Sequence, residues 1–217
     1  MVDVDELLDN PKSLTRYRVL RSARPLLAER GLSISMDDIA EAAGISRRSL
    51  FRHFESRDAL IADALESSIE IFDRELHGAL AGEGELRGWL AELTRRLLMV
   101  QRGAGVAYWQ LASAADEELP PELEAVNQQR RKNRRKLTEV VAHTAWRRAG
   151  GRTPCPTVVT DAVALTISTF TTHSLLDDYD MSLDRTVELT VAVLTAVINE
   201  ELADAGRRRS TAKAANT

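Results

Sequence analysis

The amino-acid sequence predicts an all-α protein that divides into two helical domains. Apolar residues recur at the three-to-four-residue spacing of amphipathic helices along nearly all of the 217-residue chain. Glycine and proline fall mostly between these periodic segments, where one helix ends and the next begins. We expect about nine helices, with one domain in residues 1–60, a larger one in residues 61–206, and a disordered tail in residues 207–217.

The first domain begins with an expected helix over residues 14–29. Its apolar residues share one face: Val19, Leu20, Ala23, Leu26 and Leu27. Pro25 removes a backbone donor and should kink this helix or shift its hydrogen bonding. Ser35, followed three residues later by Asp38, has the pattern of a capping box and opens a short helix that Gly44 ends. Ser46 and Ser56 are placed to cap the two helices that follow.

The second domain contains five further expected helices, separated by Gly103, Pro120-Pro121, Gly150-Gly151 and the stretch 177–180: residues 86–101, 104–116, 120–149, 157–178 and 183–205. Residues 158–172 are rich in β-branched side chains, but their length and lack of clean alternation favour a buried helix. The tail from Arg207 has no apolar periodicity, which is why we expect it to be disordered.

Charge and cysteine content narrow the class of protein. The net charge is only −4, yet residues 12–57 carry ten Lys or Arg against five acids, so the basic excess is local. The single cysteine, Cys155, excludes an internal disulfide. The acidic N-terminus does not resemble a secretory signal, and no window is apolar enough to span a membrane. We expect a cytoplasmic protein that does not bind a membrane.

The stretch GISRRSLFRHFESRDAL, residues 44–60, carries the strongest functional signal. Two short helices joined at residues 44–46 fit a helix-turn-helix. Leu50 and Phe54 would point to one side of the second helix, with Arg48 and Arg52 nearly opposite. Arginines in the first turn of a helix oppose its dipole by about 0.3–1 kcal/mol each, so they favour a nearby anion. Backbone N–H groups at helix starts and guanidinium groups both suit DNA, although an arginine-rich helix can also be a solvated face.

Residues 16–60 closely resemble the DNA-binding domain of the tetracycline-repressor-like (TetR) family of bacterial regulators. The resemblance lies in AERG, DIAEAAGIS, the aromatic-Arg-His-Phe run and SRDAL, at the spacing of the family. It implies that Arg47, Arg48 and Ser49 open a recognition helix, that Arg52 and His53 lie along it, and that Arg57 binds a phosphate. The full set of expected DNA-binding residues is Ser35, Ser46, Arg47, Arg48, Ser49, Phe51, Arg52, His53 and Arg57. His53 has an alternative role as a packed residue at the domain edge.

Two positions depart from the family pattern. Arg48 stands where the family often has glycine, and Phe51 stands where it usually has a tyrosine whose hydroxyl contacts a phosphate. Because Phe51 cannot donate that hydrogen bond, the arginines would carry more of the contact here.

The resemblance also implies that the second domain binds an effector and forms a homodimer. A long apolar stripe on the last helix suits an intersubunit four-helix bundle with residues 157–178, or alternatively an ordinary core: Leu183, Val187, Val191, Leu194 and Ile198. A dimer would place two recognition helices ~34 Å apart on a palindromic operator in double-stranded DNA.

The effector site is less defined by the sequence. Aromatic walls with a few polar groups favour ligand binding, which makes six residues candidates, with packing in the core as the alternative for each: Trp89, Tyr108, Trp109, Trp146, Phe170 and His173. The basic run at 130–136 lies within an amphipathic helix, where a solvated face is the favoured interpretation.

The sequence thus predicts a DNA-binding transcriptional regulator, a repressor that an unknown small molecule releases from its operator. The alternative is a dimeric DNA-binding regulator without an effector. An enzyme is disfavoured, because the chain has no CxxC, HExxH or GxSxG motif, and its four histidines lack metal-ligand spacing. No catalytic residue, metal or cofactor is expected.

Overall fold

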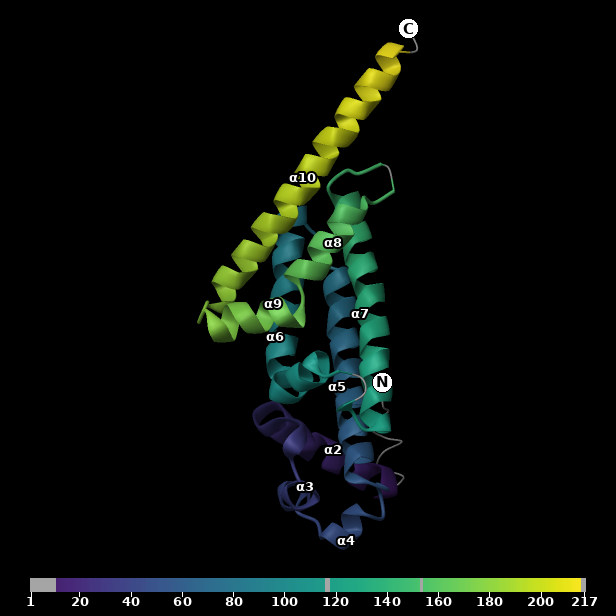
Figure 1. Ribbon diagram of the computed structural model, residues 1–217, viewed down its shortest axis with the longest axis vertical. Helices are drawn as coiled ribbons and strands as arrows, with labels where there is room; N and C mark the ends of the chain where they lie inside the picture. The colour runs from purple at the N-terminus through teal and green to yellow at the C-terminus, as the bar shows by residue number, and fades with distance from the viewer. Residues whose placement is uncertain (1–10, 116–117, 153, 216–217) are drawn as a thin grey trace. The chain divides into compact units, whose positions relative to one another are not determined.

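The computed structural model describes residues 11–115, 118–152 and 154–215, and every regular element in these ranges is a helix (Figure 1). The all-α prediction is therefore confirmed. The helices, in chain order, are α2 (Pro11–Arg30), the 3₁₀ turn Gly31–Ser33, α3 (Met36–Ala43), α4 (Arg47–Leu50), α5 (Arg57–Leu80), α6 (Leu86–Ser113), α7 (Pro121–Arg148), α8 (Thr157–Thr166), α9 (Thr169–His173), a π-helical turn Ser174–Asp178, and α10 (Leu183–Ala215). None of the helices in these ranges is long and apolar enough to cross a membrane.

The chain forms two compact units that do not follow a single boundary in the sequence. Unit 1 contains the chain up to Asp73 together with Gln101–Arg131, and unit 2 contains Arg74–Val100 and Lys132–Thr217. The long helices α5, α6 and α7 therefore each contribute residues to both units. The domain boundary expected after residue 60 differs from this division, because unit 1 also contains residues 61–73 and 101–131.

Unit 1 is built on one apolar cluster. The predicted face of α2 is buried in it through Val19, Ala23 and Leu27, and α2 runs through Pro25, which is exposed. The turn after α4 adds Phe54. Residues far along the chain complete the cluster from α6 and α7: Ala107, Leu111, Leu123 and Val126.

Gly105 interrupts α6 with a backbone conformation that other residues rarely adopt. Its φ of 58° and ψ of −149° lie outside the helical region. A Cβ atom at this position would lie 2.2 Å from the carbonyl oxygen of Ala28, so only glycine fits against α2 here. The sequence predicted this break two residues earlier, at Gly103.

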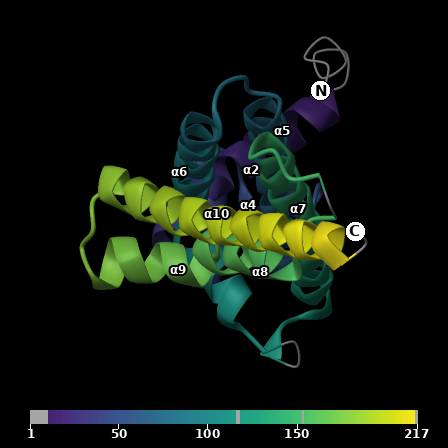
Figure 2. The ribbon, with the colours of Figure 1, turned by 90° about the horizontal axis from the view of Figure 1, so that it is seen from above.

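In unit 2, α8 and α10 lie side by side (Figure 2). The single helix expected over 157–178 is divided into α8, α9 and the π-helical turn. Ser168 caps α9 by accepting a hydrogen bond of 3.0 Å from the amide of Thr171, whose hydroxyl bonds the Leu165 carbonyl at 2.6 Å. These side chains compete with the helical backbone and explain the break at residues 167–168.

Helix α10 extends beyond the predicted limit of residue 205. Residues 207–215, expected to be a disordered tail, are helical, while 216 and 217 lie outside the described residues. Alanine, arginine and lysine all have high helix propensity, so a segment without an apolar face can still continue a helix. The prediction of a disordered tail is wrong as far as Ala215.

Candidate nucleic-acid interface

Helix α3 begins at a capping box, as the sequence predicted. The Ser35 hydroxyl oxygen accepts a hydrogen bond from the Asp38 amide at 3.1 Å, and the Ser35 amide donates to Asp38 Oδ2 at 2.8 Å. Hydrogen bonds from Ser35 and Arg30 lower the pKa of Asp38 to about 2. Ser35, expected to contact DNA, is therefore engaged in capping α3.

Gly44 and Ser46 make the turn that leads into α4. Gly44 has a φ of 64°, in the left-handed region, and its amide donates to the carbonyls of Ala40 and Glu41. Ser46 then caps α4 by accepting a hydrogen bond from the Ser49 amide at 3.1 Å. Leu50 is buried at the end of α4, so the side of α4 that carries Leu50 packs against the core. Helices α3 and α4, joined by this tight turn, form the predicted helix-turn-helix (Figure 1).

Two arginines of this segment are exposed and make no side-chain hydrogen bond or ion pair with the described residues. Arg48 and Arg52 have no side-chain partner among the described residues. Arg47 differs, because its Nη1 forms an ion pair of 2.8 Å with Asp37 of α3 and its guanidinium lies 5.6 Å from the Phe51 ring centre. Phe51 itself is 47% exposed. Arg48 and Arg52 are therefore the cations most available to a phosphate or a base edge.

The Arg57 guanidinium makes contacts within the chain that the sequence did not predict. Its Nε donates to the Ile34 carbonyl at 2.7 Å, its Nη2 donates to the Leu32 carbonyl, and its Nη1 pairs with Asp58 at 2.7 Å. All three guanidinium nitrogens thus have acceptors within the chain. Arg57 positions the segment that precedes α3, and its expected phosphate contact is not supported.

Gln110 holds the same segment from α6, a contact that the sequence did not reveal. Its Oε1 accepts a hydrogen bond of 2.7 Å from the Leu32 amide. Because the two residues are 78 positions apart, no local pattern could have linked them. The helix-turn-helix is therefore positioned by polar contacts from both α5 and α6.

Arg16 fixes the chain beyond α4, and the sequence did not single it out. Its Nη1 donates to the His53 carbonyl at 2.8 Å, its guanidinium lies 4.5 Å from the Phe54 ring centre, and its Nη2 pairs with Asp63. Burial raises the pKa of the Asp63 carboxyl, an effect that the charge of Arg16 opposes. His53 is half-buried, which agrees with the alternative of a packed residue at the domain edge.

The six aromatic and histidine candidates for ligand binding fall into both units. Tyr108 and Trp109 are half-buried in unit 1, and the other four belong to unit 2. Phe170 is 53% exposed, and His173 Nδ1 lies 2.6 Å from Asp177 Oδ2.

The two remaining candidates, Trp89 and Trp146, are core residues. Their exposed fractions are 2% and 1%. The guanidinium of Arg148 lies 4.9 Å from the Trp89 ring centre, and Gly151 packs so closely on Trp146 that a Cβ there would lie 2.2 Å from the indole. Both tryptophans are therefore packed in the core, which was the alternative to ligand binding.

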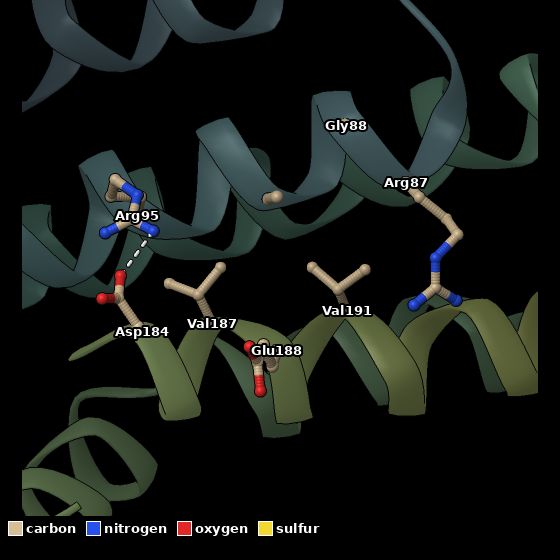
Figure 3. Close-up of a pocket in the computed structure, with 8 residues that line it drawn as sticks. Arg87, Gly88, Arg95, Asp184, Val187, Glu188 and Val191 are labelled. Carbon is tan, nitrogen blue, oxygen red and sulfur yellow. Dashed lines mark ion pairs between the residues drawn. The ribbon is translucent and has the colours of Figure 1, made fainter. Parts of the chain in front are cut away.

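A hollow of ≈ 480 Å³ lies between α6 and α10 (Figure 3). Arg95 and Asp184 form an ion pair of 2.7 Å at one end, and Val187 and Val191 point from α10 toward α6. Arg87 reaches toward α10 at the other end. None of the predicted ligand-binding residues lines this hollow.

The apolar stripe of α10 is buried within the chain, contrary to the predicted dimer interface. Leu183 is half-buried, and the other four residues are at most 5% exposed: Val187, Val191, Leu194 and Ile198. The exposed apolar residues of α8 and α10 lie elsewhere: Val158, Leu165, Leu189 and Val193. The sequence could not separate these faces, because α10 is apolar on more than one side.

The basic run at 130–136 is only partly a solvated face. Lys132, Arg135 and Lys136 are exposed as expected. Arg130 is 7% exposed, and Arg134 Nη2 donates to the Ile167 carbonyl at 3.1 Å and to the Ala164 carbonyl at 3.3 Å. Arg134 therefore satisfies carbonyls at the C-terminal end of α8.

Comparison with known proteins identifies relatives of the helix-turn-helix segment. Residues 19–64 match the model of the bacterial regulatory proteins of the tetR family. An uncharacterized HTH-type transcriptional regulator of Mycobacterium tuberculosis, Rv1255c, is 33% identical over 111 residues, which are 50% of this chain and 55% of that protein. The chain thus spans about half the length of the curated relative. The predicted resemblance of the helix-turn-helix segment to the TetR family is confirmed over residues 19–64.

Solved structures share its fold over most of their length. A TetR-like transcriptional regulator from Rhodococcus sp. RHA1 has a TM-score of 0.63 at 18% identity, covering 86% of this chain and 97% of the other. AibR, solved in complex with isovaleryl coenzyme A and operator DNA, has a TM-score of 0.59 at 17% identity, covering 82% of this chain and 96% of AibR. At these identities the similarity shows the fold alone.

Proposed function

We propose that this chain is a DNA-binding transcriptional regulator that binds a palindromic operator as a homodimer. We further propose that it is a repressor and that a small molecule releases it from the DNA. The alternative, a dimeric regulator without an effector, shares the first part of this proposal.

The observation that carries DNA binding is the pair of exposed arginines, Arg48 and Arg52, in and directly after α4. Arg48 and Arg52 are exposed without a partner among the described residues, while the neighbouring Arg47 and Arg57 are bound within the chain. Exposed guanidinium groups on a short helix, α4, and in the turn that follows it suit the phosphates and guanine edges of a major groove.

The dimer is supported by exposed apolar residues on two neighbouring helices. Leu189 and Val193 lie four residues apart on α10, and Val158 and Leu165 lie on α8 beside it (Figure 2). Such a two-helix face suits a symmetric partner with the same face, and together they would form a four-helix bundle. Val193→Asp should therefore give monomers in sedimentation, and Val140→Asp, at an exposed position of α7, should leave the dimer intact.

The proposal of release by an effector is supported by the resemblance to the TetR family and by one protein of similar fold. AibR was solved with both an acyl coenzyme A and operator DNA. In this chain an effector must prefer the conformation that does not bind DNA, because only differential binding shifts such an equilibrium.

The first experiment is a selection of genomic fragments with purified protein, followed by sequencing of the bound DNA. A palindrome that is enriched by the wild-type protein and lost with Arg48→Ala would support operator recognition. Absence of any enriched sequence at moderate salt, with and without a metabolite extract, would contradict it.

A further inference from the structure

A group of buried polar side chains in unit 1 takes no part in the helix-turn-helix. Arg130 and Asn127 lie one turn apart on α7, and Tyr108 lies on α6. Arg130 Nε donates to Asn127 Oδ1 at 2.9 Å, and the Arg130 guanidinium lies 5.5 Å from the Tyr108 ring centre. Tyr108 was a candidate from the sequence, whereas Arg130 and Asn127 were not.

Arg130 is a buried cation with no carboxylate partner among the residues that the structure describes. It is 7% exposed, and no ion pair in the described part of the chain includes it. Buried charges in proteins are normally paired, because removing an ion from water is costly. The amide oxygen and the aromatic ring offset only part of that cost, and arginine cannot become neutral by losing its proton.

Asn127 adds a second unpaired donor at the same place. Its exposed fraction is 0%, and its Nδ2 has no hydrogen-bond partner among the described residues. Buried side-chain donors in native structures rarely lack an acceptor, because leaving one unsatisfied is costly. Its neighbour Arg130 cannot supply an acceptor, because a guanidinium only donates.

These two donors stand at the end of an apolar face of α7. Positions i, i+3, i+4 and i+7 of this face are Leu123, Val126, Asn127 and Arg130. The two apolar members are 2% and 1% exposed. Because Leu123 and Val126 belong to the core cluster of unit 1, an acid that reaches these donors needs an apolar body that can lie beside that core.

We propose that Arg130 and Asn127, with Tyr108 beside them, bind the carboxylate of an apolar organic acid. This inference depends on the proposed function, because it names the chemical class of the effector. A carboxylate accepts hydrogen bonds from an arginine fork and a side-chain amide together. Its single negative charge neutralises the one guanidinium, whereas a phosphate dianion would leave a buried excess charge.

The test measures thermal stability and affinity of the full chain with straight-chain acids from butanoate to dodecanoate. Each acid is paired with its neutral primary amide, which keeps the apolar body. At least one acid should raise the Tm and its amide should not, since a ligand that binds only the folded state stabilises it. Arg130→Gln should weaken binding of that acid by at least about tenfold. The matched control Lys132→Gln, at an exposed position of the same helix, should not.

A second variant tests the site without removing the arginine. Asn127→Asp places a carboxylate of the same shape beside the guanidinium, so the chain supplies its own anion. The Tm without acid should not fall, and the response to the acid should disappear. A lower Tm, or a retained response, would refute the proposal even if Arg130→Gln does not fold.

Operator binding is measured on the same samples, so that the two proposals can fail separately. If the protein binds its operator and no acid distinguishes wild type from Arg130→Gln, the carboxylate site is refuted alone. Stabilisation by inorganic phosphate but by none of the acids would also refute it. If an acid binds through Arg130 but operator binding is absent or unchanged by the acid, the site stands and the proposed release mechanism fails.

Discussion

Replacing Arg48 by alanine should weaken operator binding without affecting the fold. Because Arg48 is exposed and has no partner among the described residues, its loss leaves no buried group unsatisfied. The free energy of unfolding should therefore change by no more than about 0.5 kcal/mol. Removing an arginine that reads a base in one half-site costs about 1–3 kcal/mol of binding free energy. A dimer carries two copies, so we expect roughly 2–6 kcal/mol, since distant sites add.

The assay is fluorescence anisotropy with the selected operator and with single-base variants of it, over a salt series. If Arg48 reads a base, the variant protein should lose its preference at one position of each half-site. If Arg48 contacts only a phosphate, all sequences should weaken alike and the salt slope should fall by about one per contact.

The control is Arg135→Ala, which removes the same charge from an exposed position of α7. Equal losses of affinity for the Arg48 and Arg135 variants would show that only net charge matters. That result, or an unchanged operator affinity of the Arg48 variant, would refute the proposal that the exposed Arg48 side chain contacts the operator.

Three other substitutions test the framework of the site. Arg57→Ala should lower the free energy of unfolding by about 1–3 kcal/mol in denaturant titrations, because the Leu32 and Ile34 carbonyls lose a charged donor. Unchanged stability together with a shallower salt dependence of DNA binding would instead favour the predicted phosphate contact. Gly105→Ala should destabilise by at least roughly 1–3 kcal/mol, from its positive φ alone, and a wild-type midpoint in urea would contradict the observed backbone. Asp38→Asn should be less stable at neutral pH. The higher stability of the wild-type protein depends on the pKa of Asp38, which is lowered from 3.8 to about 2, so the difference from the variant should shrink as the pH falls through that range. A difference in stability that does not change with pH would exclude a stabilising role for the charged Asp38 carboxylate.

Local features of the helix-turn-helix could be predicted from the sequence because their interactions span few residues. The capping box joins Ser35 to Asp38, and the left-handed turn depends on Gly44 alone. The packing side of α4 followed from the spacing of Leu50 and Phe54. The exposure of Arg48 followed from the same spacing.

The roles of other arginines could not be predicted, because their partners are distant in the sequence. Arg57 binds a carbonyl 25 residues away, and Arg134 binds one 33 residues away. A sequence pattern shows that an arginine lies at the start of a helix. It does not show whether the guanidinium group already donates hydrogen bonds to a backbone carbonyl of the chain. The stripe of α10 was misplaced for a similar reason, because periodicity identifies an apolar face without showing which neighbour covers it.

The composition of the unit 1 core has a consequence for protein engineering. Leu111 and Leu123 complete the cluster around Leu50 and Phe54, although they lie more than fifty residues further along the chain. A fragment that ends at residue 60 or 73 would therefore lose part of its own interior. A chimera that keeps unit 1 of this protein intact needs three crossovers, within α5 near Asp73, within α6 near Val100 and within α7 near Arg131, so that residues 101–131 travel with the helix-turn-helix.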